Sequence, residues 1–247
     1  MGRLVIPELR KYGFVSLLGA TRQDIGSLAL ADGPIALTQM PVEDLSPGGV
    51  LVDFSVAGNV ALLEKAAEAR QARLVIGTTG HAPAELQAIE RLASKTAVVL
   101  ASNFSLGVNR LAQCLPALHV LLQEGFEVEC LEAHHRQKRD APSGTALLLL
   151  EALLGAKPQK MTHGRVGRDL ERQEGEVGVH SLRLGQIPGE HSLFLASDSE
   201  VIEIRHRALD RAAFVSGVSP AVQFVQQQTT GLFSMTDVIG NASKTTT

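Results

Sequence analysis

The sequence of 247 residues predicts an α/β protein with two domains, one built on a parallel sheet and one on a mixed, largely antiparallel sheet. Strand-like and helix-like segments alternate over the first hundred residues, which is typical of a parallel sheet with helices on its faces. From Phe126 onward, strand-like segments follow one another with few helices between them, and this pattern favours antiparallel pairing. The composition agrees with a packed globular chain, because 45% of the residues are hydrophobic and 20% are charged.

The strands of the first domain end in small polar residues. The segments 50–54, 74–77 and 97–101 are nearly continuous apolar runs, as in strands covered on both faces. Ligands of open parallel sheets bind outside the carboxyl ends of the strands, so the polar residues that follow predict a nucleotide-sized cleft. We expect helices at 4–11, 59–70 and 84–94, strands at 14–20, 50–55, 74–77 and 97–101, and polar strand ends at Ser55, Thr78, Thr79, Gly80, Ser102 and Asn103.

The second half of the chain has a different pattern. After a strand that includes residues 126–130, further strands are expected at 177–184, 192–196 and 201–206. Between them, residues 157–176 are rich in glycine and charge and contain Pro158, which predicts an exposed loop. Helical periodicity returns at 212–227, and 231–239 is expected to dock as a tail.

One strand leads into a cluster of proton-bearing side chains. Apolar residues at 126, 128 and 130 alternate with Glu127 and Glu129, which is the period of a half-buried strand. The carboxyl end of that strand should therefore present His134 and His135, with Lys138 close behind. An imidazole and a partly desolvated ammonium can donate and accept protons near neutral pH, so this segment is a candidate for proton transfer.

The sequence predicts a helix N-terminus directly after the same segment. Residues 146–154 are strong helix formers that stop at Gly155, which makes Ser143 a candidate N-cap. The backbone N–H groups around Ser143, Gly144 and Thr145 would then point at a bound carboxylate or phosphate.

Charge and cysteine usage restrict the partners. With 23 basic and 26 acidic residues, the net charge of −3 gives no electrostatic case for nucleic acid or an anionic membrane, so we expect a small-molecule partner. Cys114 and Cys130 do not suggest a disulfide framework, which fits a reducing cytoplasm. No apolar stretch reaches the roughly eighteen residues of a membrane span.

Two other chemistries are disfavoured at this segment. Adjacent histidines on an extended chain point apart, and no cysteine or carboxylate cluster completes a metal site, so we expect none. A hydrolase with Ser143 as nucleophile would call for Gly-x-Ser-x-Gly, which is absent, and an N-cap role accounts for the serine.

The motifs together resemble those of one family. The run at 132–145, Glu-Ala-His-His-Arg-x-Lys-x-Asp-Ala-Pro-Ser-Gly-Thr, is similar to the signature of the 4-hydroxy-tetrahydrodipicolinate reductases, nicotinamide-dependent enzymes of lysine and diaminopimelate synthesis. Further landmarks follow in the family's order over almost the whole chain: Gly-Thr-Thr-Gly at 77–80, Ala-Ser-Asn-Phe-Ser-x-Gly-Val-Asn at 101–109, Gly-Glu-His at 189–191 and Gly-Leu-Phe at 231–233.

The resemblance implies a fold and an activity. Residues 1–104 with 214–247 would form a Rossmann-like dinucleotide-binding domain, and 105–213 would bind the substrate and build a homotetramer. The chain would reduce 4-hydroxy-tetrahydrodipicolinate, a cyclic dicarboxylate, to tetrahydrodipicolinate with NADH or NADPH.

The resemblance also implies residue roles. His134 would be a proton donor or acceptor, Lys138 the proton donor, and His135 a substrate contact. The turn of Ser143, Gly144 and Thr145 would hold a ring carboxylate. The cofactor would lie against Met1, Gly2, Gly77, Thr78, Thr79, Ala101, Ser102, Asn103 and Phe104.

Two places depart from the family's pattern. Relatives begin with a strand and a Gly-x-x-Gly-Arg-Met-Gly loop, whereas this sequence starts at the end of that loop, without the first strand. We expect the true start roughly ten to fifteen residues upstream. The second departure follows the strand expected at 14–20. There, Asp24 would favour the free ribose of NAD, whereas Arg22 would favour the 2′-phosphate of NADP, so the cofactor preference stays open.

Two alternative functions remain. The chain could be a degenerate, non-catalytic relative that lost cofactor binding with its first strand, or an oxidoreductase of the same architecture with another substrate, such as an amino-acid dehydrogenase. His180 and residues 205–207 are expected on a polar sheet face or at a subunit contact, whereas Arg183 and His191 stay open as site residues.

Overall fold

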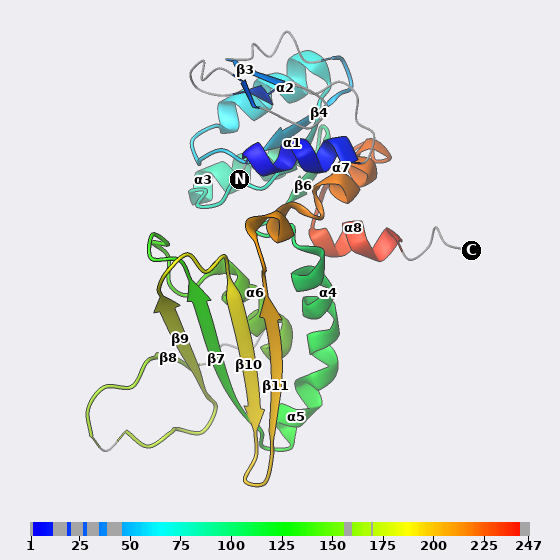
Figure 1. Ribbon diagram of the computed structural model, residues 1–247. Coiled ribbons are helices and arrows are strands. Elements are labelled where there is room, and N and C mark those ends of the chain that lie inside the picture. The colour runs from blue at the N-terminus through cyan, green and yellow to red at the C-terminus, as the bar shows by residue number, and fades with distance from the viewer. Residues whose placement is uncertain are drawn as a thin grey trace. The chain divides into compact units, whose positions relative to one another are not determined.

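The computed structural model describes residues 2–11, 19–20, 27–28, 35–38, 46–155, 160–168 and 170–242. The chain divides into two compact units, Met1–Ser105 with Phe214–Thr247 and Leu106–Ala213 (Figure 1). One unit contains a parallel sheet and the other a mixed sheet, so the predicted α/β class is confirmed.

A four-stranded sheet forms the centre of the first unit. Its order is β12-β6-β5-β4, and every neighbouring pair is parallel. The predicted apolar runs account for it, since Leu74, Ile76 and Val98 are buried under the helices of one face. The elements are β4 (Val50–Asp53), α2 (Val60–Arg70), β5 (Arg73–Ile76), α3 (Pro83–Ala93), β6 (Ala97–Leu100), α7 (Val218–Gln226) and β12 (Gly231–Phe233).

Helices cover this sheet as parallel strands require. α2 and α3 share one core cluster with the sheet, while α7 contacts β4, β5 and β6. α7 also contacts α1 (Gly2–Lys11) and α8 (Met235–Ala242), so the tail expected to dock does so. The short 3₁₀ helix η3 (Arg211–Val215) precedes α7, and three further strands form a separate small sheet: β1 (Gly19–Ala20), β2 (Ser27–Leu28) and β3 (Ile35–Thr38).

The second unit contains a five-stranded sheet in the order β11-β10-β7-β9-β8. β10 is antiparallel to both β7 and β11, whereas β9 is parallel to both β7 and β8. The elements are α4 (Leu106–Cys114), η2 (Leu115–Leu118), α5 (His119–Gln123), β7 (Glu127–His134), α6 (Gly144–Leu154), β8 (Lys160–His163), β9 (Glu176–Arg183), β10 (Glu190–Ala196) and β11 (Val201–Arg207).

Two expectations about this sheet need correction. Antiparallel pairing does not predominate, because the four pairings divide equally between parallel and antiparallel. α6 lies between β7 and β9 in the chain and allows a crossover to a parallel neighbour. In addition, the segment 157–176, which is expected to be a loop, contains the strand β8. The polar sequence of β8 lacks the apolar pattern that would predict a strand.

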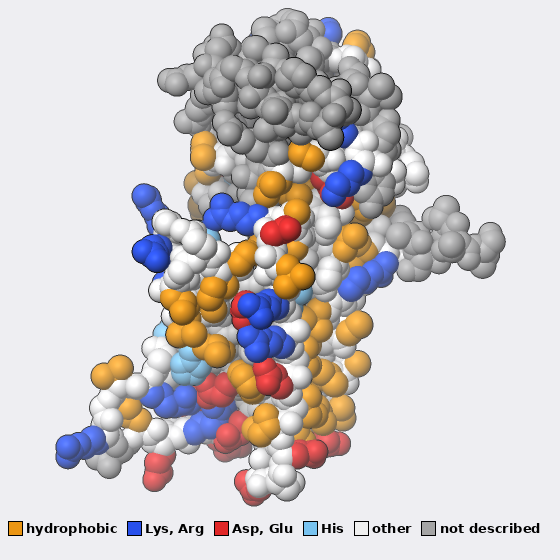
Figure 2. Space-filling model, viewed as in Figure 1, with side chains coloured by type: hydrophobic (Ala, Val, Ile, Leu, Met, Phe, Trp, Pro, Cys, Tyr) orange, Lys and Arg blue, Asp and Glu red, His pale blue; other side chains and the backbone are white. Residues whose placement is uncertain are grey.

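Helices cover one face of the five-stranded sheet. Leu149, Leu150 and Leu153 of α6 pack with Cys130, Leu193 and other apolar residues of that face in one buried cluster. The opposite face carries the alternate residues, and acidic, basic and hydrophobic side chains are interspersed over it (Figure 2). Among the described residues, no helix is both long and apolar enough to cross a bilayer.

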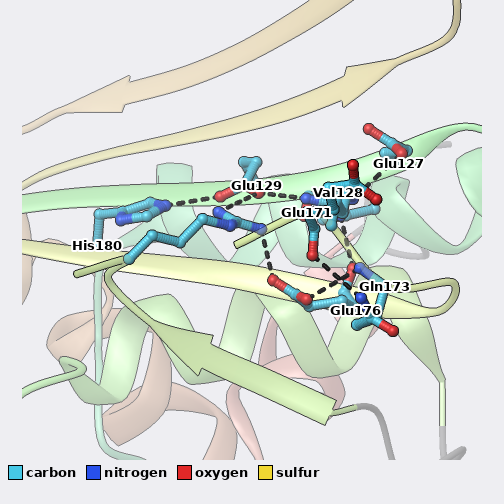
Figure 3. Close-up of polar contacts among 9 residues, drawn as sticks. Glu127, Val128, Glu129, Glu171, Gln173, Glu176 and His180 are labelled. Carbon is cyan, nitrogen blue, oxygen red and sulfur yellow. Dashed lines mark hydrogen bonds and ion pairs between the residues drawn. The ribbon is translucent and has the colours of Figure 1, made fainter. Parts of the chain in front are cut away.

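Arginine contacts attach the segment between β8 and β9 to the open face of β7. Arg165 donates to Glu129 at 3.1 Å, and Arg172 binds Glu129 and donates to the Val128 and Glu176 carbonyl oxygens at 2.9 and 2.6 Å (Figure 3). His180 lies 2.6 Å from the same Glu129 carboxylate. This arrangement requires Gly178, because a Cβ there would overlap the Glu129 carboxylate.

Candidate active site

The helix-covered face of the second sheet becomes polar at the carboxyl end of β7. Along β7 the residues that face the helices are Val128, Cys130, Glu132 and His134. The first two belong to the apolar core, and the last two place polar side chains on the same face. The register sets His191 of β10 opposite Glu132, and His206 of β11 opposite His191. β9 completes the same rows, with Ser181 opposite Glu132 and Arg183 opposite His134.

Glu132 holds His134 through a buried contact. Nδ1 of His134 bonds to Oε2 of Glu132, and the Arg183 guanidinium donates to Oε2 at 3.0 Å and Oε1 at 2.7 Å. Glu132 is fully buried, and burial alone would raise the pKa of its carboxyl, but the bonds from His134 and Arg183 outweigh it and lower the pKa to about 2. An ionised carboxylate only accepts hydrogen bonds, so this contact favours the His134 tautomer with the proton on Nδ1 and Nε2 as the acceptor nitrogen.

Lys138 lies in the turn that follows His134. Its Nζ donates to both oxygens of Asp140, at 3.0 and 2.9 Å, and its backbone N–H donates to the His135 carbonyl at 3.1 Å. Arg183 also donates to the Asp140 backbone carbonyl at 2.7 Å. The pKa of Asp140 falls because the bond from Lys138 and its charge outweigh the burial that would raise it.

Ser143 caps α6, as predicted. Its backbone is extended, and its Oγ accepts from the Ala146 N–H at 3.1 Å. The same Oγ lies 3.1 Å from Nε2 of His191, a residue of the distant strand β10. Ser143 thus connects the helix N-terminus to the histidine row of the sheet. Gly144 and Thr145 form the first turn of α6.

Burial lowers the pKa of three histidines around this site. His191 is 1% exposed, and burial, followed by the nearby rings of His134 and His206, lowers its pKa to about 3. Burial also lowers the pKa of His206 and, with Arg211 adding to the effect, that of His135. Among the described residues, Nδ1 has no hydrogen-bond partner in His135, His191 and His206. The His134 and His191 rings meet edge to face, with centroids 5.1 Å apart.

In the first unit, polar groups meet at the carboxyl ends of neighbouring strands. Asp53 ends β4, and its carboxylate accepts from Thr78 Oγ1 at 2.8 Å and from the Ser55 N–H at 3.1 Å. Thr78 Oγ1 accepts in turn from the Ser55 N–H at 2.9 Å. Asn103, after β6, accepts the Ser105 N–H at 2.7 Å and is buried. The polar groups at the ends of β4 and β5 therefore contact one another, whereas the contact given for Asn103 lies within its own turn.

Gly77 lets an aromatic ring approach the backbone at this edge. A Cβ on Gly77 would overlap the Phe54 ring, and Phe54 lies 5.1 Å from the Phe104 ring between centroids. Thr78 is buried after β5, whereas Thr79 and Ser102 are exposed and Ala101 is half-buried. Of the remaining residues expected to bind the cofactor, Gly2 begins α1 and Met1 lies outside the described residues, as do Arg22 and Asp24.

Several residues of these sites were missed from the sequence. The motif at 132–145 contains Glu132 without indicating its role, and the apolar run at 50–54 indicates only a strand for Asp53 and Phe54. The charge pattern at 205–207 does not distinguish His206 from its neighbours. The period of two would have separated His206 from Arg205 and Arg207, whose side chains reach Glu190 on the open face. Among the described residues, no group of three or more His, Cys, Asp or Glu side chains could hold a metal.

Comparisons with known proteins agree with this architecture. Residues 1–104 match the family model described as dihydrodipicolinate reductase, N-terminus, and residues 107–239 match its C-terminal counterpart. The 4-hydroxy-tetrahydrodipicolinate reductase of Dinoroseobacter shibae is 37% identical, and that of Nitrosomonas europaea is 39% identical. Each alignment covers 97% of this chain and 94% of the relative.

A solved structure shares the fold. The dipicolinate-bound dihydrodipicolinate reductase from Paenisporosarcina sp. TG-14 superimposes with a TM-score of 0.68 at 24% identity, over 94% of this chain and 92% of that one. Matches to both family models and relatives above 30% identity establish the kinship: the chain belongs to the 4-hydroxy-tetrahydrodipicolinate reductase family.

Proposed function

We propose that this chain reduces 4-hydroxy-tetrahydrodipicolinate to tetrahydrodipicolinate with a reduced nicotinamide cofactor, in the synthesis of diaminopimelate and lysine. One observation carries the proposal. His134 and Lys138, each held by its own carboxylate, lie at the end of β7, just before the capped N-terminus of α6. Two proton carriers next to an anion-attracting helix end suit a dicarboxylate whose reduction consumes protons.

The chemistry assigns work to both proton carriers. Addition of a hydride to a conjugated ring carbon leaves negative charge that a proton must quench, and the departing hydroxyl leaves as water only after protonation. The elimination of water also releases one proton from the ring, so overall one hydride and one proton enter and one water leaves. Lys138 is the proton donor in this proposal, and His134 donates or accepts through Nε2.

The substrate carboxylates need fixed positive partners. The N-terminus of α6 at Ser143, Gly144 and Thr145 supplies partial positive charge from backbone N–H groups. His135 contributes an imidazole whose pKa burial and the charge of Arg211 lower, so it suits a hydrogen bond to the substrate. A threonine at position 145 can add a hydroxyl donor to a carboxylate.

The residues of the first unit fit a nicotinamide cofactor. The cofactor supplies the hydride when bound. Gly77 has no Cβ, which makes room for the Phe54 ring. The ends of β5 and β6 offer backbone, hydroxyl and aromatic groups for the nicotinamide and its ribose. We assign this role to Gly77, Thr78, Thr79, Ala101, Ser102, Asn103 and Phe104, with Met1 and Gly2 as in the family pattern, and to NADH or NADPH alike.

Three properties complete the proposal. The unit of residues 106–213 binds the substrate and also builds a homotetramer, for which the exposed Leu182 and Val201 on the open sheet face offer apolar contact. The other unit binds the dinucleotide. Both cysteines are free thiols, which agrees with a reducing cytoplasm.

The test is a turnover assay on the purified chain with each cofactor. Lys138→Met and His134→Gln should chiefly lower kcat, whereas Thr145→Val should chiefly raise KM for the dicarboxylate. Lys95→Met is the matched control, because Lys95 makes an ion pair of the same 2.9 Å length, with Glu68, in the other unit. Absence of turnover with either cofactor would reject the function, and full turnover in Lys138→Met would reject the donor assignment.

A further inference from the structure

One guanidinium connects both proposed proton carriers. Arg183 donates through two nitrogens to the Glu132 carboxylate, which holds His134, and through Nη2 to the Asp140 carbonyl, whose side chain holds Lys138. Arg183 itself touches neither proton carrier in any of these bonds. Its side chain is only 20% exposed, and that of Glu132 is fully buried, so solvent screens the contact weakly.

We propose that Arg183 is a positioning residue for the reductase reaction: it fixes Glu132 against His134 and the Asp140 backbone beside Lys138, so that both proton carriers keep one arrangement. This inference rests on the proposed function and adds a residue to it. A fully buried carboxylate without a cation would lose its charge or its place, and the His134 ring would lose its orientation with it.

The charges around Glu132 leave this role to Arg183. On β7 the neighbouring group is His134, and on β10 and β11 the facing groups are His191 and His206, whose pKa values burial lowers. The turn after β7 contributes Lys138, which is engaged with Asp140, and His135, whose pKa burial also lowers. Among the described residues, Glu132 forms ion pairs with Arg183 and His134 alone.

The planar shape of arginine suits the position. Both oxygens of Glu132 and the Asp140 carbonyl lie within 3.0 Å of the two terminal nitrogens. A lysine has one ammonium and reaches one such acceptor well, so it keeps the charge but not the geometry. Arg183→Lys therefore separates positioning from simple charge neutralisation, and it avoids the unpaired buried carboxylate that would endanger folding of Arg183→Gln.

The opposite face of β7 offers a matched control. Arg172 binds the Glu129 carboxylate and donates to the Val128 and Glu176 carbonyl oxygens, so it combines carboxylate and backbone contacts as Arg183 does (Figure 3). Its carboxylate partner, Glu129, lies on the face of β7 away from His134. Arg172→Lys therefore perturbs the same kind of ion pair on the same strand without involving the proton carriers.

The experiment compares wild type, Arg183→Lys and Arg172→Lys in the turnover assay. Arg183→Lys should lower kcat by about ten- to a hundredfold, with KM for both substrates changed less than about threefold. Its solvent deuterium isotope effect on kcat should rise, since proton delivery becomes slower, whereas a smaller folded fraction would leave that ratio unchanged. Arg172→Lys should keep the kcat and the isotope effect of the wild type.

Three results would overturn the proposal: a folded Arg183→Lys protein with unchanged kcat, an unchanged isotope effect, or an equal loss in Arg172→Lys. If the wild type itself shows no turnover, the proposed function fails, and a second measurement still decides the positioning. The ¹⁵N spectrum of His134, assigned with His134→Gln, should show the Nδ1–H tautomer in wild type and a mixture in Arg183→Lys. The same tautomer in both proteins would refute the role of Arg183.

Discussion

Replacement of Ser143 by alanine removes two contacts of buried groups at the start of α6. Ser143 Oγ accepts from the Ala146 N–H and bonds to Nε2 of His191, both at 3.1 Å, and the serine is 2% exposed. Loss of a serine N-cap costs about 1 kcal/mol. His191 already has an unpartnered Nδ1, so the variant leaves its buried ring without a hydrogen bond among the described residues, at about 1–2 kcal/mol more.

Ser143→Ala should therefore lower the free energy of unfolding by about 2–3 kcal/mol. Urea denaturation followed by circular dichroism measures this change, and amide hydrogen exchange at Ala146 should become faster. Ser94→Ala is the control, because Ser94 also bonds at a helix end, to the Arg91 carbonyl at 2.7 Å, but is exposed. A loss below about 0.5 kcal/mol in Ser143→Ala, equal to that expected of the control, would refute the reasoning.

Three further predictions concern burial. His191 should make the fold sensitive to acid, because its pKa of about 3 in the folded state lies below the unfolded value of about 6.5. The free energy of unfolding should fall by up to about 1.4 kcal/mol per pH unit as the pH drops from about 6.5 toward 3. His191→Gln should flatten this slope in urea titrations at different pH values. Native Cys130, fully buried with its thiol pKa raised to about 12 by burial, should resist iodoacetamide while exposed Cys114 reacts, and equal labelling in mass spectra would contradict this. Gly178→Ala should displace Glu129 and release the arginine contacts of the segment before β9, seen as faster proteolysis there than in Gly240→Ala, where a Cβ meets open space.

Local periodicity predicted much of the fold and, in the candidate site, the position of His134 and the N-cap at Ser143. The alternation of strands and helices gave the parallel sheet, and the period of two placed His134 at the end of its strand. Helix-forming residues after Ser143 gave the N-cap. Each of these features depends on neighbours in sequence, where side-chain spacing decides which face a residue occupies.

The contacts that the sequence does not predict depend on strand pairing. Arg183 reaches Glu132 because β9 pairs in parallel with β7, and His191 reaches Ser143 because β10 lies on the other side of β7. Strand order and register arise from packing of the whole sheet and leave little trace in any one segment. β8 was missed for a related reason, since a short polar edge strand lacks an apolar pattern.

In the proposed function, this chain transfers a hydride from a nicotinamide cofactor to a ring carbon of the dicarboxylate. The most direct measurement supplies cofactor deuterated at the transferable position and weighs the tetrahydrodipicolinate formed by the purified full chain. The product should carry one deuterium and should form far more slowly with Lys138→Met than with Lys95→Met. Product without deuterium, or no product with either cofactor, would contradict it.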